Sequence, residues 1–109
     1  MRDLGNWFRV LTSGLVTAGC AGTMQAPGGT IADATLQGDV MRYIALFEGA
    51  RGGMCSQWKL ANTEVTEGNP PGNWVERWTV DRCGQSIRYR VTYMPSPQGG
   101  TTLGVGEER

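Results

Sequence analysis

Residues 87–93 alternate strictly between apolar and polar side chains, and this period constrains the fold more than any other feature of the chain. Every second residue from Ile87 to Tyr93 is apolar, and the residues between them are Arg88, Arg90 and Thr92. Side chains of a strand point alternately to its two faces, so the pattern predicts a strand with one buried and one solvated face. Such strands are typical of antiparallel sheets that are covered on one side only.

Three other segments show weaker forms of the same alternation. The expected strands are residues 57–65, 74–83 and 101–105, and the segments between them carry the residues of turns and loops. The run 66–72 contains two adjacent prolines flanked by glycines, which stop both helix and sheet. We therefore expect four strands joined by short connections.

The alternation also assigns side chains to the two faces of the sheet. On the covered face we expect Trp58, Leu60, Trp78, Val80, Tyr89 and Val91. On the opposite face we expect Lys59, Thr63, Arg77, Thr79 and Asp81.

Residues 39–51 form the one convincing helix in the sequence. Val40, Ile44 and Phe47 recur at helical spacing and predict the stripe that covers the sheet. Asp39 is suited to cap the start of the helix, where its charge also meets the positive end of the helix dipole. The side expected to face solvent carries Arg42, Glu48 and Arg51.

These elements predict an α+β fold. One amphipathic helix is followed by strands with short connections, which gives an antiparallel meander of about four strands and not parallel crossovers. No internal repeat is present in the sequence.

The start of the chain resembles the leader of bacterial lipoproteins. Arg2 and Arg9 precede a short apolar stretch that ends in the run Leu15-Val16-Thr17-Ala18-Gly19-Cys20, which is similar to the lipobox of that family, although Thr17 stands where the family prefers Leu. The alternative is a poorly ordered N-terminus with a chance Ala-Gly-Cys. The resemblance implies that residues 1–19 are removed and that Cys20 is acylated and attached to the lipid bilayer. Ala21, which is not aspartate, resembles the pattern of lipoproteins sent to the outer membrane.

The lipoprotein resemblance also bears on the other cysteines. With Cys20 acylated outside the cytoplasm, Cys55 and Cys83 are left as a pair in an oxidising compartment, where a disulfide is expected. The small and glycine-rich residues up to Gly29 predict a flexible tether at 20–29. One small domain is then expected at residues 30–109.

A second resemblance covers roughly the last half of the chain. The segments Glu76-Arg77-Trp78-Thr79-Val80-Asp81-Arg82-Cys83-Gly84 and Tyr89-Arg90-Val91-Thr92-Tyr93 resemble the C-terminal half of small uncharacterised proteobacterial lipoproteins. The resemblance implies a fold and a place in the cell envelope, and it brings no activity.

Composition excludes several kinds of chemistry. The chain has no histidine, so a histidine-based triad is impossible, and its cysteines lack the close spacing of a zinc site. A thiol-dependent enzyme would need a reactive cysteine, and Cys83 beside Arg82 is the only candidate. Ten acidic and ten basic residues balance, which gives no global charge for binding nucleic acid. We expect no catalytic residue, no metal and no cofactor.

Charged side chains on the strands allow two interpretations. Arg77, Arg88 and Arg90 could form a basic stripe for an acidic partner or an anionic glycan, but an ordinary solvated face is the simpler interpretation. The acidic residues Glu64, Glu67, Glu76 and Asp81 are then expected to be solvated partners of those arginines. Trp74 beside the proline loop is either an exposed contact residue or packed on the prolines.

Together these features predict a lipid-anchored envelope protein that acts as a non-enzymatic binding or assembly module with an unidentified protein partner. The alternative is a periplasmic inhibitor of an envelope-targeting enzyme, in which a loop at residues 67–74 enters the cleft of the target. A thiol-dependent enzyme ranks last.

Overall fold

The described part of the chain forms one helix and a four-stranded sheet. The computed structural model describes residues 25–51, 53 and 55–108, so the predicted leader and Cys20 lie outside the described residues. The elements are α2 (Ala34–Arg51), β2 (Trp58–Gly68), β3 (Trp74–Arg82), β4 (Gln85–Pro95) and β5 (Thr101–Glu107).

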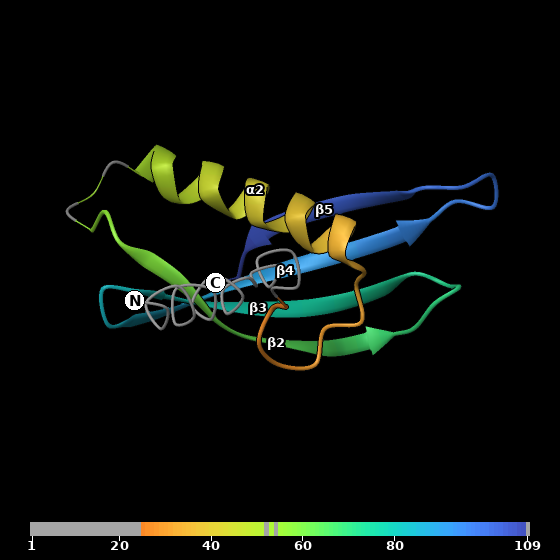
Figure 1. Cartoon of the computed structure of the whole chain (residues 1–109), viewed down its shortest axis with the longest axis horizontal. Coiled ribbons are helices and arrows are strands. Elements are labelled where there is room, and N and C mark those ends of the chain that lie inside the picture. The colour runs from red at the N-terminus through yellow and green to blue at the C-terminus, as the bar shows by residue number, and fades with distance from the viewer. Residues whose placement is uncertain (1–24, 52, 54, 109) are drawn as a thin grey trace, which may run out of the picture.

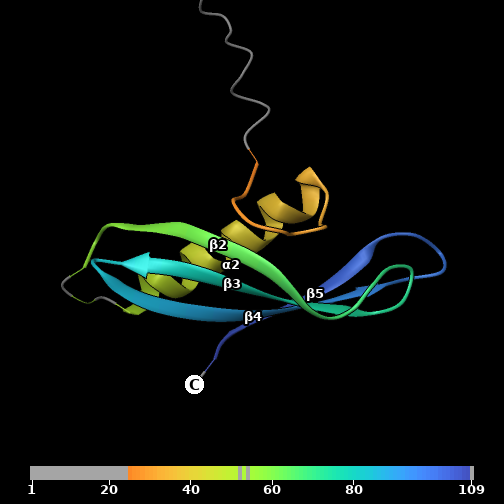
Figure 2. The same ribbon diagram turned by 90° about the horizontal axis from the view of Figure 1, so that it is seen from below.

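The sheet is an antiparallel meander in the order β2-β3-β4-β5, which confirms the predicted topology and the α+β class (Figure 1). Helix α2 and the segment before it lie on the same face of the sheet (Figure 2). The core between these layers contains Val40 and Ile44 of the helix and Trp78, Val80, Tyr89, Val91 and Tyr93 of the sheet. Within the described residues, α2 is not apolar enough to cross a membrane.

Helix α2 begins five residues earlier than the sequence predicts. The backbone N–H of Leu36 donates to the Asp33 carboxylate at 2.8 Å, so Asp33 caps the helix, and the prediction of Asp39 as the cap is wrong. Asp39 lies one turn inside the helix, where its carboxylate pairs with Arg42 on the exposed side.

The buried stripe of α2 is also rotated from the predicted one. The buried residues are Gln37, Val40, Ile44 and Glu48, whereas Phe47 is 41% exposed, with its ring tilted against that of Tyr89 at 5.8 Å between ring centroids. Glu48, which was expected to face solvent, follows Ile44 by four residues and therefore lies on the same line. It is buried because Arg82 from β3 reaches under the helix to pair with it.

Two β-bulges change the phase of β2. The register with β3 shifts between Leu60 and Asn62 and again between Val65 and Glu67. After an extra residue, side chains that simple alternation places outside point inside. Thr63 was expected on the solvated face, but it is 1% exposed on the covered face.

The segment 25–33 packs across β2 and β3, so the end of the predicted tether differs from the prediction. Gly29 N–H donates to the carbonyl of Thr63 at 2.8 Å, and the Thr63 hydroxyl donates to the carbonyl of Pro27 at 2.7 Å. Gly28 has a φ of +98°, and a Cβ there would lie 2.2 Å from the Thr63 oxygen, so only glycine fits this close approach. Residues 27–29 are therefore part of the folded domain.

The disulfide between Cys55 and Cys83 is present, as predicted. It ties the segment after α2 to the turn between β3 and β4, over a sequence separation of 28 residues. Closing a loop of this length stabilises the folded state by about 3.6 kcal/mol in the chain-entropy account.

Candidate protein-interaction site

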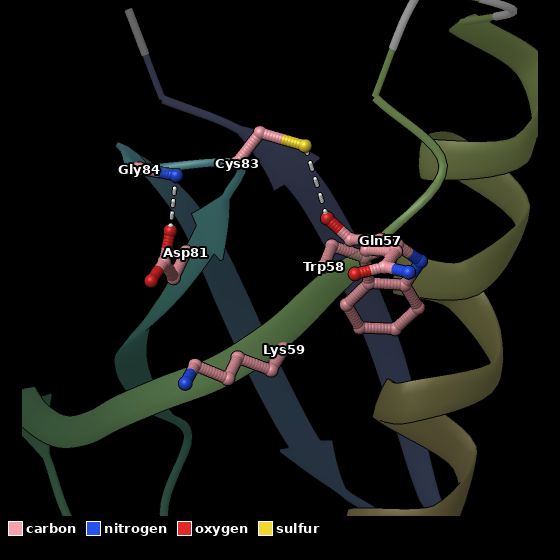
Figure 3. A pocket seen from close by; sticks show the side chains of 6 residues that line it. All are labelled: Gln57, Trp58, Lys59, Asp81, Cys83 and Gly84. Atoms are coloured by element: carbon pink, nitrogen blue, oxygen red, sulfur yellow. Dashed lines mark hydrogen bonds between the residues drawn. The ribbon is translucent and has the colours of Figure 1, made fainter.

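A shallow pocket lies beside the disulfide, at the turn between β3 and β4 (Figure 3). Cys83 and Gly84 both have positive φ, as a tight hairpin turn requires, and the Asp81 carboxylate accepts a hydrogen bond from Gly84 N–H at 2.7 Å. The Cys83 sulfur lies 3.5 Å from the Gln57 carbonyl oxygen, which is a contact only, since a disulfide sulfur carries no proton. Neither Cys55 nor Cys83 is therefore available as a thiolate nucleophile.

Glu76 lies at the centre of the core and is fully buried, so its assignment to the solvated face was wrong. Its Oε1 accepts hydrogen bonds from Thr30 Oγ1 at 2.7 Å, Trp78 Nε1 at 2.8 Å and the Tyr93 hydroxyl at 3.0 Å. Its Oε2 accepts from Ile31 N–H and Trp74 Nε1, each at 3.0 Å. Burial alone would raise the pKa of Glu76, but these hydrogen bonds together hold the pKa below its ordinary value.

The sequence contained a signal for this burial. Glu76 is two residues from Trp74 and two residues from Trp78, so strict alternation places all three side chains on one face of the strand. Because both oxygens of Glu76 are fully engaged by five donors, this carboxylate ties residues 30–31 to the sheet and offers no free atom for acid–base chemistry.

A second buried carboxylate, Glu48, joins the end of α2 to the sheet. Arg82 holds it through two parallel hydrogen bonds, Nε to Oε1 and Nη2 to Oε2, both at 2.7 Å, and the Tyr89 hydroxyl donates to Oε2 at 2.5 Å. The hydrogen bonds from Arg82 hold the pKa of Glu48 below its usual range despite its burial. Arg82 follows Val80 by two residues, so strand alternation places both side chains on the covered face, and this spacing is the signal in the sequence that Arg82 points inward.

These groups predict that stability falls at both extremes of pH. Folding lowers the pKa values of Glu48 and Glu76, so both carboxylates stabilise the folded state at pH values above their unfolded pKa of about 4.3. This stability is lost as the pH falls through the pKa values that the two groups have in the folded state. Burial raises the pKa values of Tyr89 and Tyr93, so their contribution is present below about pH 10 and lost above it. Urea denaturation from about pH 3 to 11 should show a plateau with two declining limbs. A free energy of unfolding that stays constant from about pH 5 to 3 would contradict this assignment.

The predicted arginine stripe lies on the open face of the sheet, and ion pairs neutralise much of it. Arg77 lies between Glu64 and Glu108, with one nitrogen–oxygen distance of 3.0 Å to each carboxylate. Arg90, opposite Arg77 on β4, lies 3.7 Å from Glu67. Arg88 is exposed two residues before Arg90. The geometry favours the solvated-face interpretation over a site for an anionic partner.

Trp74 does not join the arginines. It is 4% exposed on the covered face, where its ring stacks on Tyr93 at 4.4 Å between ring centroids. It is therefore not an exposed contact residue, and its partners are Tyr93 and Glu76. The other predicted site residue, Cys20, lies outside the described residues.

Sequence reasoning missed a groove between α2 and the outer edge of β5. The groove has a volume of about 540 Å³ and is lined by Asp39, Arg42, Tyr43 and Leu46 of the helix and Thr101, Thr102 and Leu103 of the strand. Two apolar side chains of this lining are exposed, Tyr43 at 45% and Leu46 at 69%, and Phe47, which follows Leu46 on the helix, is 41% exposed. Large apolar groups gathered in this way mark surfaces that bind other proteins. The signal in the sequence is the spacing 43, 46 and 47, which forms a second apolar stripe beside the buried one.

No metal site accompanies this groove, because the described residues contain no group of three acidic or cysteine side chains able to hold an ion. Comparison with models of protein families, with curated proteins and with solved structures gave no match.

Proposed function

We propose that this chain is an envelope lipoprotein, anchored in the bilayer through acylated Cys20, that acts as a non-enzymatic binding or assembly module. The groove between α2 and β5 is its contact surface. The observation that carries this proposal is the 69% exposure of Leu46 beside the outer edge of β5, which pairs with no further strand among the residues that the structure describes. An apolar side chain next to open backbone hydrogen-bonding groups suits the addition of an extended segment to the sheet.

The inhibitor alternative has less support. The tip of the β2–β3 hairpin, residues 69–73, is exposed and projects beyond the helix (Figure 1). It contains only asparagine, proline and glycine, because Trp74 is turned into the core. Without a large apolar side chain the tip has no anchor of the kind that dominates protein interfaces.

The proposal is tested by photo-crosslinking the full chain in intact bacterial cells. A photo-reactive amino acid in place of Leu46 should give a covalent protein adduct in the membrane fraction. The same amino acid in place of Met94, which is 37% exposed on the open face of the sheet, should give none. With Cys20→Ala, the protein and its adduct should leave the membrane fraction.

Each part of the proposal can fail separately in this experiment. Equal or absent adducts at the two positions would refute the groove as the contact surface. Retention of the Cys20→Ala variant in the membrane fraction would refute the lipid anchor.

A further inference from the structure

The two edges of the sheet differ in how they are protected. The β2 edge carries two bulges and the charged residues Lys59, Glu64 and Glu67, and its Thr63 carbonyl is already bonded to Gly29. Bulges, charges and covering segments are the devices that keep sheet edges from pairing with other chains. In the described part of the chain, β5 shows no bulge in its register with β4, and its charge is confined to Glu107 at its end, since residues 101–106 carry none.

The ladder between β4 and β5 identifies which backbone groups of β5 are free. Glu108 N–H donates to the Arg88 carbonyl at 2.8 Å, so these two residues form a hydrogen-bonded pair. Hydrogen-bonded pairs alternate along an antiparallel ladder, and Gly106, Gly104 and Thr102 therefore bond to β4. The N–H and C=O groups of the residues between them point away from the sheet. These residues are Thr101, Leu103, Val105 and Glu107.

The free edge is complementary to itself. If two copies of β5 pair antiparallel about Gly104, Leu103 of each copy lies opposite Val105 of the other, and Thr101 lies opposite Glu107. All four free residues then have partners, which gives about eight backbone hydrogen bonds. No like charges meet in this register, and the whole chain has equal numbers of acidic and basic residues.

The side chains near the edge fit the same arrangement. Leu103 and Val105 are half-buried on the face covered by α2. A two-fold axis at Gly104 would place the helices of both copies on one face of a continuous sheet. The exposed residues Leu46 and Phe47 of each copy would then lie toward the axis, where burial of apolar surface stabilises association.

We propose that the occupant of the α2–β5 groove is a second copy of this chain, joined to the first through β5 in a two-fold symmetric, eight-stranded sheet. The inference rests on the proposed function, because it names the partner of the same surface.

A pair of cysteine substitutions in the full chain tests the register directly. At the axis the two copies of Gly104 form a non-hydrogen-bonded pair with Cα atoms about 4.5 Å apart, a separation that a disulfide spans. Two copies of Gly106 would be four residues out of register, roughly 13 Å apart, which is too far. A Cβ at either glycine meets no atom closer than 4.0 Å, so both substitutions fit the fold.

Under mild oxidation, Gly104→Cys should give at least about tenfold more covalent dimer than Gly106→Cys on a non-reducing gel. Both variants should be compared with the unsubstituted chain, which reports any dimer formed through the native cysteines. Adding Leu46→Asp to Gly104→Cys should abolish the crosslink, because it places two like charges near the axis. Equal crosslinking by the two cysteine variants would overturn the dimer.

The outcome separates the two proposals. If Gly104→Cys does not crosslink and the photo-reactive group at Leu46 captures a different polypeptide, the dimer is refuted and the binding module stands. If Gly104→Cys gives no crosslinked dimer and the photo-reactive group at Leu46 gives no protein adduct, both proposals are refuted.

Discussion

Replacing Glu76 with glutamine should lower the free energy of unfolding by about 4 kcal/mol, although the new side chain has nearly the same shape. The carboxylate accepts five hydrogen bonds in the core, three at Oε1 and two at Oε2. A glutamine amide accepts at one of these positions and donates at the other. Whichever way it turns, its NH₂ group faces at least one buried N–H.

The cost of Glu76→Gln depends on how far the surrounding donors can adjust. The hydroxyls of Thr30 and Tyr93 can rotate and become acceptors, but the indole N–H groups of Trp74 and Trp78 cannot. Each buried donor without a partner costs about 1–3 kcal/mol, and the two hydrogens of the amide add to this. Two buried groups left without partners therefore account for the expected loss.

Denaturation in urea, followed by tryptophan fluorescence, measures this effect, since two of the donors are tryptophans. Glu67→Gln is the matched control, because Glu67 is exposed on β2 and lies 3.7 Å from Arg90. Exposed ion pairs contribute little, so the control should change the free energy of unfolding by less than about 1 kcal/mol. If the two variants were equally stable, Glu76 would not organise the core as described.

Periodicity was sufficient for the meander because β3 and β4 alternate along their whole length and turn residues separate all four strands. It also assigned Trp78, Val80 and Val91 to the core, where all three are fully buried. It failed in β2, because nothing in residues 60–67 reveals the two bulges. Each bulge adds one residue and so exchanges which side chains point to the covered face and which to the open face. Bulges arise from pairing with the neighbouring strand, which the pattern of one strand does not contain.

The two buried carboxylates were missed for a different reason. Glu48 continues the buried line of the helix, and Glu76 lies on the covered face of its strand. A glutamate is almost always exposed, so the prediction gave more weight to the residue type than to the position. Their burial depends on donors from distant segments, such as Arg82 for Glu48 and Thr30 for Glu76. The groove at β5 was missed because an open edge is a property of strand order, which only the assembled sheet defines.

Arg82→Met should lower the free energy of unfolding by about 3–5 kcal/mol, because it leaves the Glu48 carboxylate buried without a counter-charge. The side chains of Arg82 and Glu48 are only 10% and 3% exposed, so water does not replace the lost guanidinium. The remaining donor to Glu48 among the side chains of the sheet is the Tyr89 hydroxyl. Arg88→Met on the exposed face of β4 is the matched control, and it should change stability by less than about 1 kcal/mol.

The loss in Arg82→Met should be reversed largely by removing the other polar partners as well. A buried ion pair recovers in Coulomb energy roughly what its desolvation costs, so replacing the whole cluster by apolar side chains of similar volume is often neutral. We expect the triple variant Glu48→Leu, Arg82→Met, Tyr89→Phe to unfold within about 2 kcal/mol of the unsubstituted chain. Urea denaturation of the single and triple variants, compared as a thermodynamic cycle, measures this coupling. If the triple variant lost at least as much stability as Arg82→Met alone, neutralisation of Glu48 would not be the role of Arg82.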